Sequence, residues 1–267
     1  MRAFRLAYDG EPFHGFQRQP DVPTVEDALF DALRALEVLE PDDDKPPEYA
    51  AAGRTDAGVS ALGQVVAFEA PGWLTPAALN GELPADMRAW ASAEAPTDFH
   101  ATRDAAAREY AYYLCAPGAD LERTREAAAR FEGTHDFHNF SAASEATTRT
   151  VLETGVERDG NHLRVRVRGD GFVHEQVRRM VSVLGAVARG ESEIERIETA
   201  LSARKLDGPE GIAPAAAYPL LLVDVEYPDL EFTVDEGAAE SARDVFAARR
   251  IERRTRAQVA EAITDGI

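Results

Sequence analysis

The sequence predicts an α+β protein in which helices pack on antiparallel or mixed sheets. Segments with period-two alternation of apolar residues and segments with helical period follow one another in mixed order. They do not form the regular strand–helix–strand repeat that indicates a parallel sheet. Apolar residues make up 45% of the 267 residues and charged residues 29%. That balance supports a packed core and excludes wholesale disorder.

The first hundred residues contain predicted strands and two predicted helices. Residues 2–8 alternate, with Phe4, Leu6 and Tyr8 on one face, which predicts a strand. Thr24, with Asp27 three residues later, is typical of a capping box, so a helix is expected from residue 25 to about residue 36. After a polar linker at 40–48, strands are expected at 49–52 and 64–69, a short helix from residue 76, and a strand at 86–93.

The rest of the chain continues in the same mixed order. Strands are expected at 108–116, 150–157, 162–168 and 219–227, with a hairpin turn at Asp159-Gly160-Asn161. Helices are expected at 121–132 and 172–189. Another is expected to begin at Ser192, with Glu195 as a second capping pair, and the charged tail from residue 238 is also expected to be helical. A break near 101–107 suggests two α/β domains, 1–105 and 106–235, followed by a helical tail at 236–267.

The chain is strongly acidic, with 48 Asp and Glu against 29 Lys and Arg and a net charge of −19. Only Lys45 and Lys205 are lysines. Such a balance indicates either a protein that avoids polyanions or one whose acidic surface is adapted to high salt, and we prefer the second interpretation. The distribution of arginine is then more informative about nucleic acid than the net charge is.

Two stretches, 158–190 and 240–256, are basic against this background, with seven and six arginines and three acidic residues each. In the strand at 162–168, Arg164, Arg166 and Arg168 alternate with apolar residues and so share one face. Rows of guanidinium groups bind phosphates well, because each is a planar fork. The alternative is a solvated sheet face and a solvated helix.

Several classes of protein are excluded or disfavoured. No apolar run is long enough for a membrane span, and the N-terminus lacks a signal-peptide pattern, so we expect a cytoplasmic protein. The single Cys115 excludes an internal disulfide and a zinc site built from several cysteines. His135 and His138 form a poor metal site without a third ligand. Ser60 and Ser141 have no nearby base and acid of a serine hydrolase.

The most unusual local sequence is Gly53-Arg54-Thr55-Asp56-Ala57-Gly58. Glycines permit a tight loop and the close approach of a ligand. A carboxylate in such a loop, with a cation two residues away, can stay ionised while shielded from water, which suits a nucleophile or a general base. The spacing is not that of a phosphate-binding P-loop, because Val59-Ser60 follows where Lys and Ser or Thr are needed. The alternative is a turn whose aspartate caps backbone amides.

Many segments, in order and at fitting distances, resemble the TruA-type tRNA pseudouridine synthases along nearly the whole chain. They are YDGEPFHGFQRQP with TVEDALFDAL, GRTDAGVSALGQVVAFE, ALNGELPADMRAW, DFHATRDAAAREYAYYL, FEGTHDFHNFS and GDGFVHEQVRRMVSVLGAVARG. The resemblance implies two α/β domains of RNA-recognition type with an active-site cleft between them. It implies conversion of uridine to pseudouridine in the anticodon stem-loop of tRNA, a homodimer, and no cofactor or metal. Residues beyond 235 have little counterpart in the family.

The resemblance also assigns roles to individual residues. Asp56 is expected to be the nucleophile, Arg54 to displace or hold the target nucleotide, Tyr110 to contact the uracil, and Arg178 to pair with the catalytic carboxylate. Arg164, Arg166, Arg168 and Arg179 are the further candidates for tRNA binding. Our hypothesis is that Asp56, Arg54 and Arg178 form one coupled site.

The chemistry is compatible with these roles and leaves one choice open. Pseudouridine formation breaks the N1–C1′ bond and joins C5 to C1′, and the carboxylate can attack either the uracil ring or the ribose carbon. A proton must then leave C5, for which Tyr110 is one candidate base. Two other functions stay open at this point. They are a non-catalytic RNA-binding protein on the same scaffold, and a hydrolase with an aspartate nucleophile, which generally needs a second carboxylate.

Overall fold

The structure is a computed structural model, and it describes residues 1–142 and 145–267. In these described residues, ten strands form one sheet in the order β10-β4-β1-β3-β9-β5-β8-β7-β6, with β2 paired to β3. The strands are β1 (Arg2–Tyr8), β2 (Ala50–Ala51), β3 (Ser60–Phe68), β4 (Met87–Glu94), β5 (Ala107–Cys115), β6 (Gly133–Asp136), β7 (Thr148–Asp159), β8 (His162–Gly169), β9 (Leu220–Glu226) and β10 (Thr233–Val234). The α-helices are α1 (Val25–Ala35), α2 (Pro76–Glu82), α3 (Leu121–Ala129), α4 (Gln176–Ala188), α5 (Glu195–Leu201) and α6 (Glu236–Asp265).

Within residues 1–142 and 145–267, the sheet is mixed because of one parallel pairing, between β3 and β9. Ser60 lies opposite Leu221 and Ala61 opposite Leu222, whereas the other strand pairs are antiparallel. The backbones approach closely here: a Cβ on Gly63 would lie 2.5 Å from the Val223 carbonyl oxygen. The α+β class expected from the sequence is confirmed, and the two expected sheets meet edge to edge along β3 and β9.

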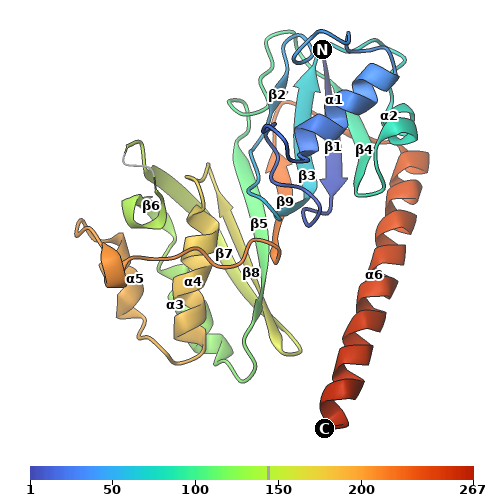
Figure 1. Cartoon of the computed structure of the whole chain (residues 1–267). Coiled ribbons are helices and arrows are strands. Elements are labelled where there is room, and N and C mark those ends of the chain that lie inside the picture. The colour runs from blue at the N-terminus through green and yellow to red at the C-terminus, as the bar shows by residue number, and fades with distance from the viewer. Residues whose placement is uncertain (143–144) are drawn as a thin grey trace.

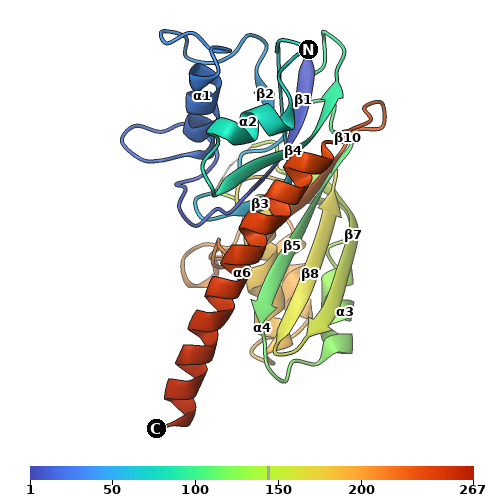
Figure 2. The ribbon, with the colours of Figure 1, turned by 90° about the vertical axis from the view of Figure 1, so that its right-hand side faces the viewer.

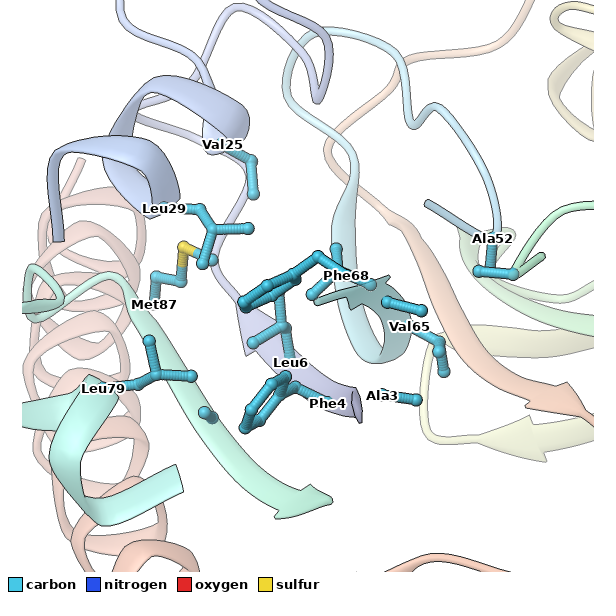
Figure 3. Packing of buried hydrophobic residues seen from close by; sticks show 14 of the residues in the cluster. Ala3, Phe4, Leu6, Val25, Leu29, Ala52, Val65, Phe68, Leu79 and Met87 are labelled. Atoms are coloured by element: carbon cyan, nitrogen blue, oxygen red, sulfur yellow. The ribbon is translucent and has the colours of Figure 1, made fainter. Parts of the chain in front are cut away.

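Two hydrophobic cores lie on either side of this junction. The first is built from residues between 3 and 101 together with Leu222, Val225 and Tyr227 of the returning C-terminal segment. Figure 3 shows Phe4 and Phe68 of β1 and β3 within it, packed below α1, and the two rings stack at 5.4 Å. The second core lies between the sheet and α3 and α4, and it contains Leu163, Val165 and Val167 of β8. The segment at 53–59 lies where the two cores meet.

Helix α6 lies on the sheet face opposite α3 and α4 (Figures 1 and 2). It begins at the N-cap Asp235, whose carboxylate accepts from the backbone amide of Ala238, and its first turns bury Ala238, Ala239 and Ala242. The helix then continues past the sheet toward the C-terminus, where its side chains are exposed. In residues 1–142 and 145–267, no helix combines the length and apolarity that a membrane span needs.

Most predicted elements are present, and the differences concern where they begin or end. The expected capping of α1 is confirmed, because the Thr24 hydroxyl accepts from the Asp27 amide at 3.2 Å. The helix expected over 172–189 begins only at Gln176, because Glu175 adopts a left-handed conformation with φ of 61°. Helix α5 begins at Glu195 after Ile194 rather than after Ser192, whose hydroxyl donates instead to the Glu193 carbonyl.

Two further boundaries differ from the prediction, and two short strands are additional. Helix α3 ends at Ala129, and Glu132, expected within it, accepts instead from the Thr154 amide at 2.9 Å. Strand β3 begins at Ser60, inside the expected loop, because β1 and β9 pair with its first residues. Strands β6 and β10 were not expected; they are short edge strands whose few residues leave little periodicity to detect.

Candidate active site

The loop at residues 53–59, which we call the Asp56 loop, is anchored at its start by a fully buried amide. The Gln64 side-chain oxygen accepts from the backbone amides of Gly53 at 3.3 Å and Val65 at 3.1 Å. Its nitrogen donates to the Gly53 carbonyl at 2.8 Å. A buried amide must satisfy its hydrogen bonds internally, so Gln64 ties the loop to the middle of β3.

The middle and end of the Asp56 loop rest on the segment at residues 9–16, which follows β1. The Phe16 amide donates to the Thr55 carbonyl at 2.9 Å, and the Gly58 amide donates to the Phe13 carbonyl at 3.2 Å. The buried hydroxyl of Tyr8, the last residue of β1, lies 2.8 Å from the Thr55 hydroxyl. The backbone on both sides of Asp56 is therefore held by β1 and by the segment that follows it.

Both oxygens of the Asp56 carboxylate face groups from the start of α4. Arg178 NH1 donates to Asp56 Oδ2 at 2.9 Å, and His174 Nε2 lies 3.3 Å from Asp56 Oδ1. The Asp56 side chain is 20% exposed and that of Arg178 14%, so water screens their pair only partly. The guanidinium holds the carboxylate in a fixed, partly shielded position, which suits a nucleophile.

The backbone just before α4 orients His174 and Arg178 toward the Asp56 loop. The left-handed Glu175 separates His174 from the helix, a conformation that costs a non-glycine residue about 1–3 kcal/mol and is commonly found at functional sites. The Glu175 carboxylate accepts from Arg178 at 3.2 Å and from Arg179 at 2.7 Å. Arg178 Nε also donates to the Ala215 carbonyl at 2.8 Å. Arg178 is therefore fixed on three sides, with one nitrogen directed at Asp56.

Asp56 lines a cleft of about 950 Å³ between the two cores. Tyr110 of β5 forms part of its wall, with the edge of the Phe172 ring packed against it at 5.3 Å. Burial raises the pKa of Tyr110 to about 12, an effect that Arg108 opposes and Asp56 reinforces. The Tyr110 phenol therefore stays protonated at neutral pH. Arg108 donates to the Ala52 carbonyl at 3.1 Å and to the Thr102 carbonyl at 2.6 Å, which closes the cleft wall beside the loop.

The structure brings some of the expected residues together and separates others. Asp56, Arg178, Tyr110 and Arg54 all line the cleft, and the expected pairing of Arg178 with Asp56 is present. Arg54 is exposed and has no ion pair within residues 1–142 and 145–267. Of the three residues in the coupled-site hypothesis, two are in contact and the third lines the same cleft.

The expected tRNA-binding arginines lie elsewhere. The predicted separation of faces in β8 is confirmed, because Leu163, Val165 and Val167 are buried in the second core. The β8 arginines therefore point to the sheet face opposite α3 and α4. Arg168 donates to Glu226 at 2.6 Å and Arg166 lies 3.7 Å from Glu109, while Arg179 is paired with Glu175. Their role in tRNA binding stays a prediction.

Several residues of the cleft were not expected from the sequence. His174 and Glu175 lie in the segment predicted as helix, and their position depends on the irregular turn. Gln64, a polar residue in an otherwise apolar strand, was the one local signal of a buried hydrogen-bonding role. A hydrolase would need a second carboxylate near Asp56. Glu175 is the candidate in this cleft, but each of its oxygens forms an ion pair with an arginine. Within the described ranges, no cluster of three His, Cys, Asp or Glu residues is arranged to hold a metal.

Comparison with known proteins decides between these functions. A family model described as "tRNA pseudouridine synthase" matches residues 127–228. A protein of Haloarcula marismortui named "tRNA pseudouridine synthase A" is 53% identical over 100% of both chains. The chain belongs to the tRNA pseudouridine synthase family. Proteins of the same name from Natronomonas pharaonis, at 56% identity over 99% of both chains, and from Halobacterium salinarum, at 52% over 97% of both, are also similar to it.

Membership of the pseudouridine synthase family makes this chain an isomerase. The family of the chain therefore matches the resemblance recognised in its sequence motifs. The tail is shared as well, because the chain and its Haloarcula relative cover each other completely. The non-enzymatic and hydrolase alternatives have no comparable support.

Proposed function

We propose that this synthase converts uridine to pseudouridine in the anticodon stem-loop of tRNA, with Asp56 as the nucleophile and without a metal or cofactor. The observation that carries the proposal is the Asp56 carboxylate itself. It lies in the cleft between the two cores, held by Arg178 at 2.9 Å and faced by His174 at 3.3 Å. A positioned carboxylate open to a cleft is what covalent catalysis on a nucleoside requires.

The reaction can begin with attack of Asp56 on the uracil ring or on the ribose C1′. In either case the N1–C1′ bond breaks, the detached uracil turns, C5 joins C1′ and the C5 proton leaves. Arg178 would hold the carboxylate in position before attack and after release, because Glu175 accepts from the same NH1 and the Ala215 carbonyl accepts from Nε, which together fix the guanidinium. Arg178 acts on the nucleophile and Asp56 on the substrate.

The target uridine must leave its stack to reach Asp56, at a cost of a few kcal/mol. The cleft supplies an aromatic wall from Tyr110 and Phe172 that a flipped uracil could contact. Because the raised pKa of Tyr110 keeps its phenol protonated, we infer that Tyr110 donates a hydrogen bond to the uracil more readily than it removes the C5 proton. Arg54, an exposed residue of the Asp56 loop, would fill the space that the flipped base leaves.

The tRNA backbone would be held by cations around the cleft. Lys45, Arg54 and Arg149 line it and form no ion pair among the described residues. Their positive charges stand out in a chain of net charge −19. We propose that these residues contact phosphates near the target uridine, with Arg164, Arg166, Arg168 and Arg179 as more distant candidates. A homodimer in the cytoplasm, with one tRNA touching both subunits, is part of the same proposal.

The experiment is to incubate the protein with unmodified tRNA transcripts and to map pseudouridine at single-nucleotide resolution. We expect pseudouridine in the anticodon stem-loop, and transcripts whose anticodon-arm uridines are changed to cytidine should not be modified. Conversion confined to another arm would contradict the proposed substrate site. Tight binding without conversion would point to the non-catalytic alternative.

A further inference from the structure

Asp9, the residue directly after β1, is a buried carboxylate that is not among the residues lining the cleft. Its side chain is 4% exposed. Its two ion-pair partners both come from helix α6: Arg249 NH1 at 3.1 Å and Arg253 NH2 at 2.5 Å from Asp9 Oδ2. They are separated from Asp9 by 240 and 244 residues of chain. A buried carboxylate without a partner is strongly destabilising, so these arginines have a specific task.

The same two arginines also neutralise the carboxylates around Asp9. Arg249 NH2 lies 2.5 Å from Asp86 Oδ1, and Arg253 NH2 lies 2.7 Å from Glu11 Oε2. No other Lys or Arg in the described part of the chain forms an ion pair with these three acids. Without α6, three carboxylates would be left close together and would repel one another.

The segment that begins at Asp9 is the support of the Asp56 loop. Gly10 is packed against the end of that loop so closely that a Cβ on it would lie 2.3 Å from the Val59 carbonyl oxygen. The Gly10 amide donates to the Ser60 hydroxyl at 3.0 Å, and the Phe13 amide donates to the Gly10 carbonyl at 3.0 Å. A shift of Asp9 would therefore be transmitted directly to the backbone that holds Asp56.

We propose that Arg249 and Arg253 are positioning residues, through which helix α6 clamps the 9–16 segment against the Asp56 loop. The inference rests on the proposed function, because it takes the position of Asp56 to be what limits turnover. It gives the C-terminal tail a role that does not require contact with RNA. Arg250 and Arg254, their neighbours on the helix, are exposed and have no ion pair within the described residues. They provide a matched control with the same loss of charge.

The test compares Arg249→Gln/Arg253→Gln with Arg250→Gln/Arg254→Gln, measuring kcat and KM for tRNA. Displacement of a reacting group by about 1 Å can cost about 10²-fold in rate, so we expect kcat of the first variant to fall by about that factor with KM nearly constant. The control should keep both constants. Adding Asp9→Asn to the first variant removes the unpaired buried charge and should restore most of kcat.

Hydrogen exchange of the amides at residues 53–60 gives a second readout that does not depend on catalysis. Exchange should be faster in Arg249→Gln/Arg253→Gln than in the control, and Asp9→Asn should slow it again. Equal increases in KM for both variants, with kcat unchanged, would show that the tail arginines bind RNA and would overturn the clamp. So would a failure of Asp9→Asn to restore kcat and slow exchange.

Two further results, a variant that does not fold and an active Asp56→Asn, can also be interpreted. If Arg249→Gln/Arg253→Gln does not fold, recovery of folding by Asp9→Asn supports the clamp, and a triple variant that still does not fold contradicts it. If Asp56→Asn remains active, the proposed nucleophile is wrong, but the exchange comparison still decides whether α6 holds the loop.

Discussion

Asp56 and Arg178 are 122 residues apart in the chain, and their side chains meet at 2.9 Å between Oδ2 and NH1. One comes from the loop after β2 and the other from the first turn of α4, so the pair bridges the two hydrophobic cores. The strength of the pair depends on its surroundings: Arg178 is held by Glu175 and by the Ala215 carbonyl, and Asp56 by its loop. The chemistry of the site thus depends on both halves of the sheet.

The first prediction concerns Arg178. Arg178→Ala should lower kcat by about 10²-fold or more, because the carboxylate loses its fixed partner while Glu175 is left half-paired. Arg178→Lys keeps the charge but cannot reach Asp56 and Ala215 together, so an intermediate loss is expected. Steady-state rates with tRNA, alongside circular dichroism to verify folding, provide the measurement. Unaltered turnover in the alanine variant would contradict the proposed coupling between Arg178 and Asp56.

A second prediction separates His174 from Arg178. His174 is 66% exposed and lies 3.3 Å from the second Asp56 oxygen, so it orients the carboxylate from the cleft side. We expect His174→Ala to lower kcat by about 10-fold and His174→Gln, which keeps a donor at a similar reach, to lower it less. Both variants should bind tRNA normally. Equal losses in the two variants would assign His174 a packing or steric role instead.

A third prediction follows from the buried tyrosines. Burial raises the pKa of Tyr8, Tyr49 and Tyr227 well above the ordinary value of 10.0, and that of Tyr110 to about 12. Below pH 10 the phenols are neutral in both folded and unfolded chains. Above it the unfolded chain loses protons that the folded chain keeps, so the free energy of unfolding should fall by up to about 1.4 kcal/mol per pH unit for each tyrosine.

Urea titrations between pH 8 and pH 11 measure this dependence. Tyr8→Phe should reduce the slope above pH 10 by about the contribution of one buried tyrosine. A stability that stays constant up to pH 11 would be incompatible with neutral, buried phenols.

The fourth prediction concerns salt. If the acidic surface is an adaptation to high salt, pseudouridine formation should persist at molar KCl, where phosphate contacts alone weaken steeply. Binding would then depend on stacking, shape and hydrogen bonds in the cleft. Rates measured from 0.1 to 3 M KCl at saturating tRNA test this, with the free energy of unfolding followed over the same range. Activity that disappears above physiological salt would contradict the adaptation.

The sequence predicted the elements better than the contacts between them. Period-two and helical patterns located most strands and helices, and the family motifs singled out Asp56, Tyr110 and Arg178. Local patterns could not reveal that Gln64 pins Gly53, because burial of an amide depends on strands distant in sequence. The helical period of 172–189 likewise concealed the left-handed Glu175.

Charge patterns were the least reliable guide to position. The alternation in β8 correctly grouped Arg164, Arg166 and Arg168 on one face, but only the tertiary structure shows that this face is opposite the core below α3 and α4. In the tail, the six arginines at 240–256 indicate either phosphate binding or a solvated helix. Two of them pair instead with a buried aspartate more than 200 residues away, a partner that no local spacing indicates.

The most direct test of the central claim is pseudouridine formation by Asp56→Asn, measured under single-turnover conditions with tRNA binding determined in parallel. Asparagine keeps the size of the side chain and can still accept from Arg178, but it is a very poor nucleophile. We predict a loss of about 10³-fold or more in the rate with binding nearly unchanged. Conversion of uridine at an ordinary rate by this variant would contradict the account.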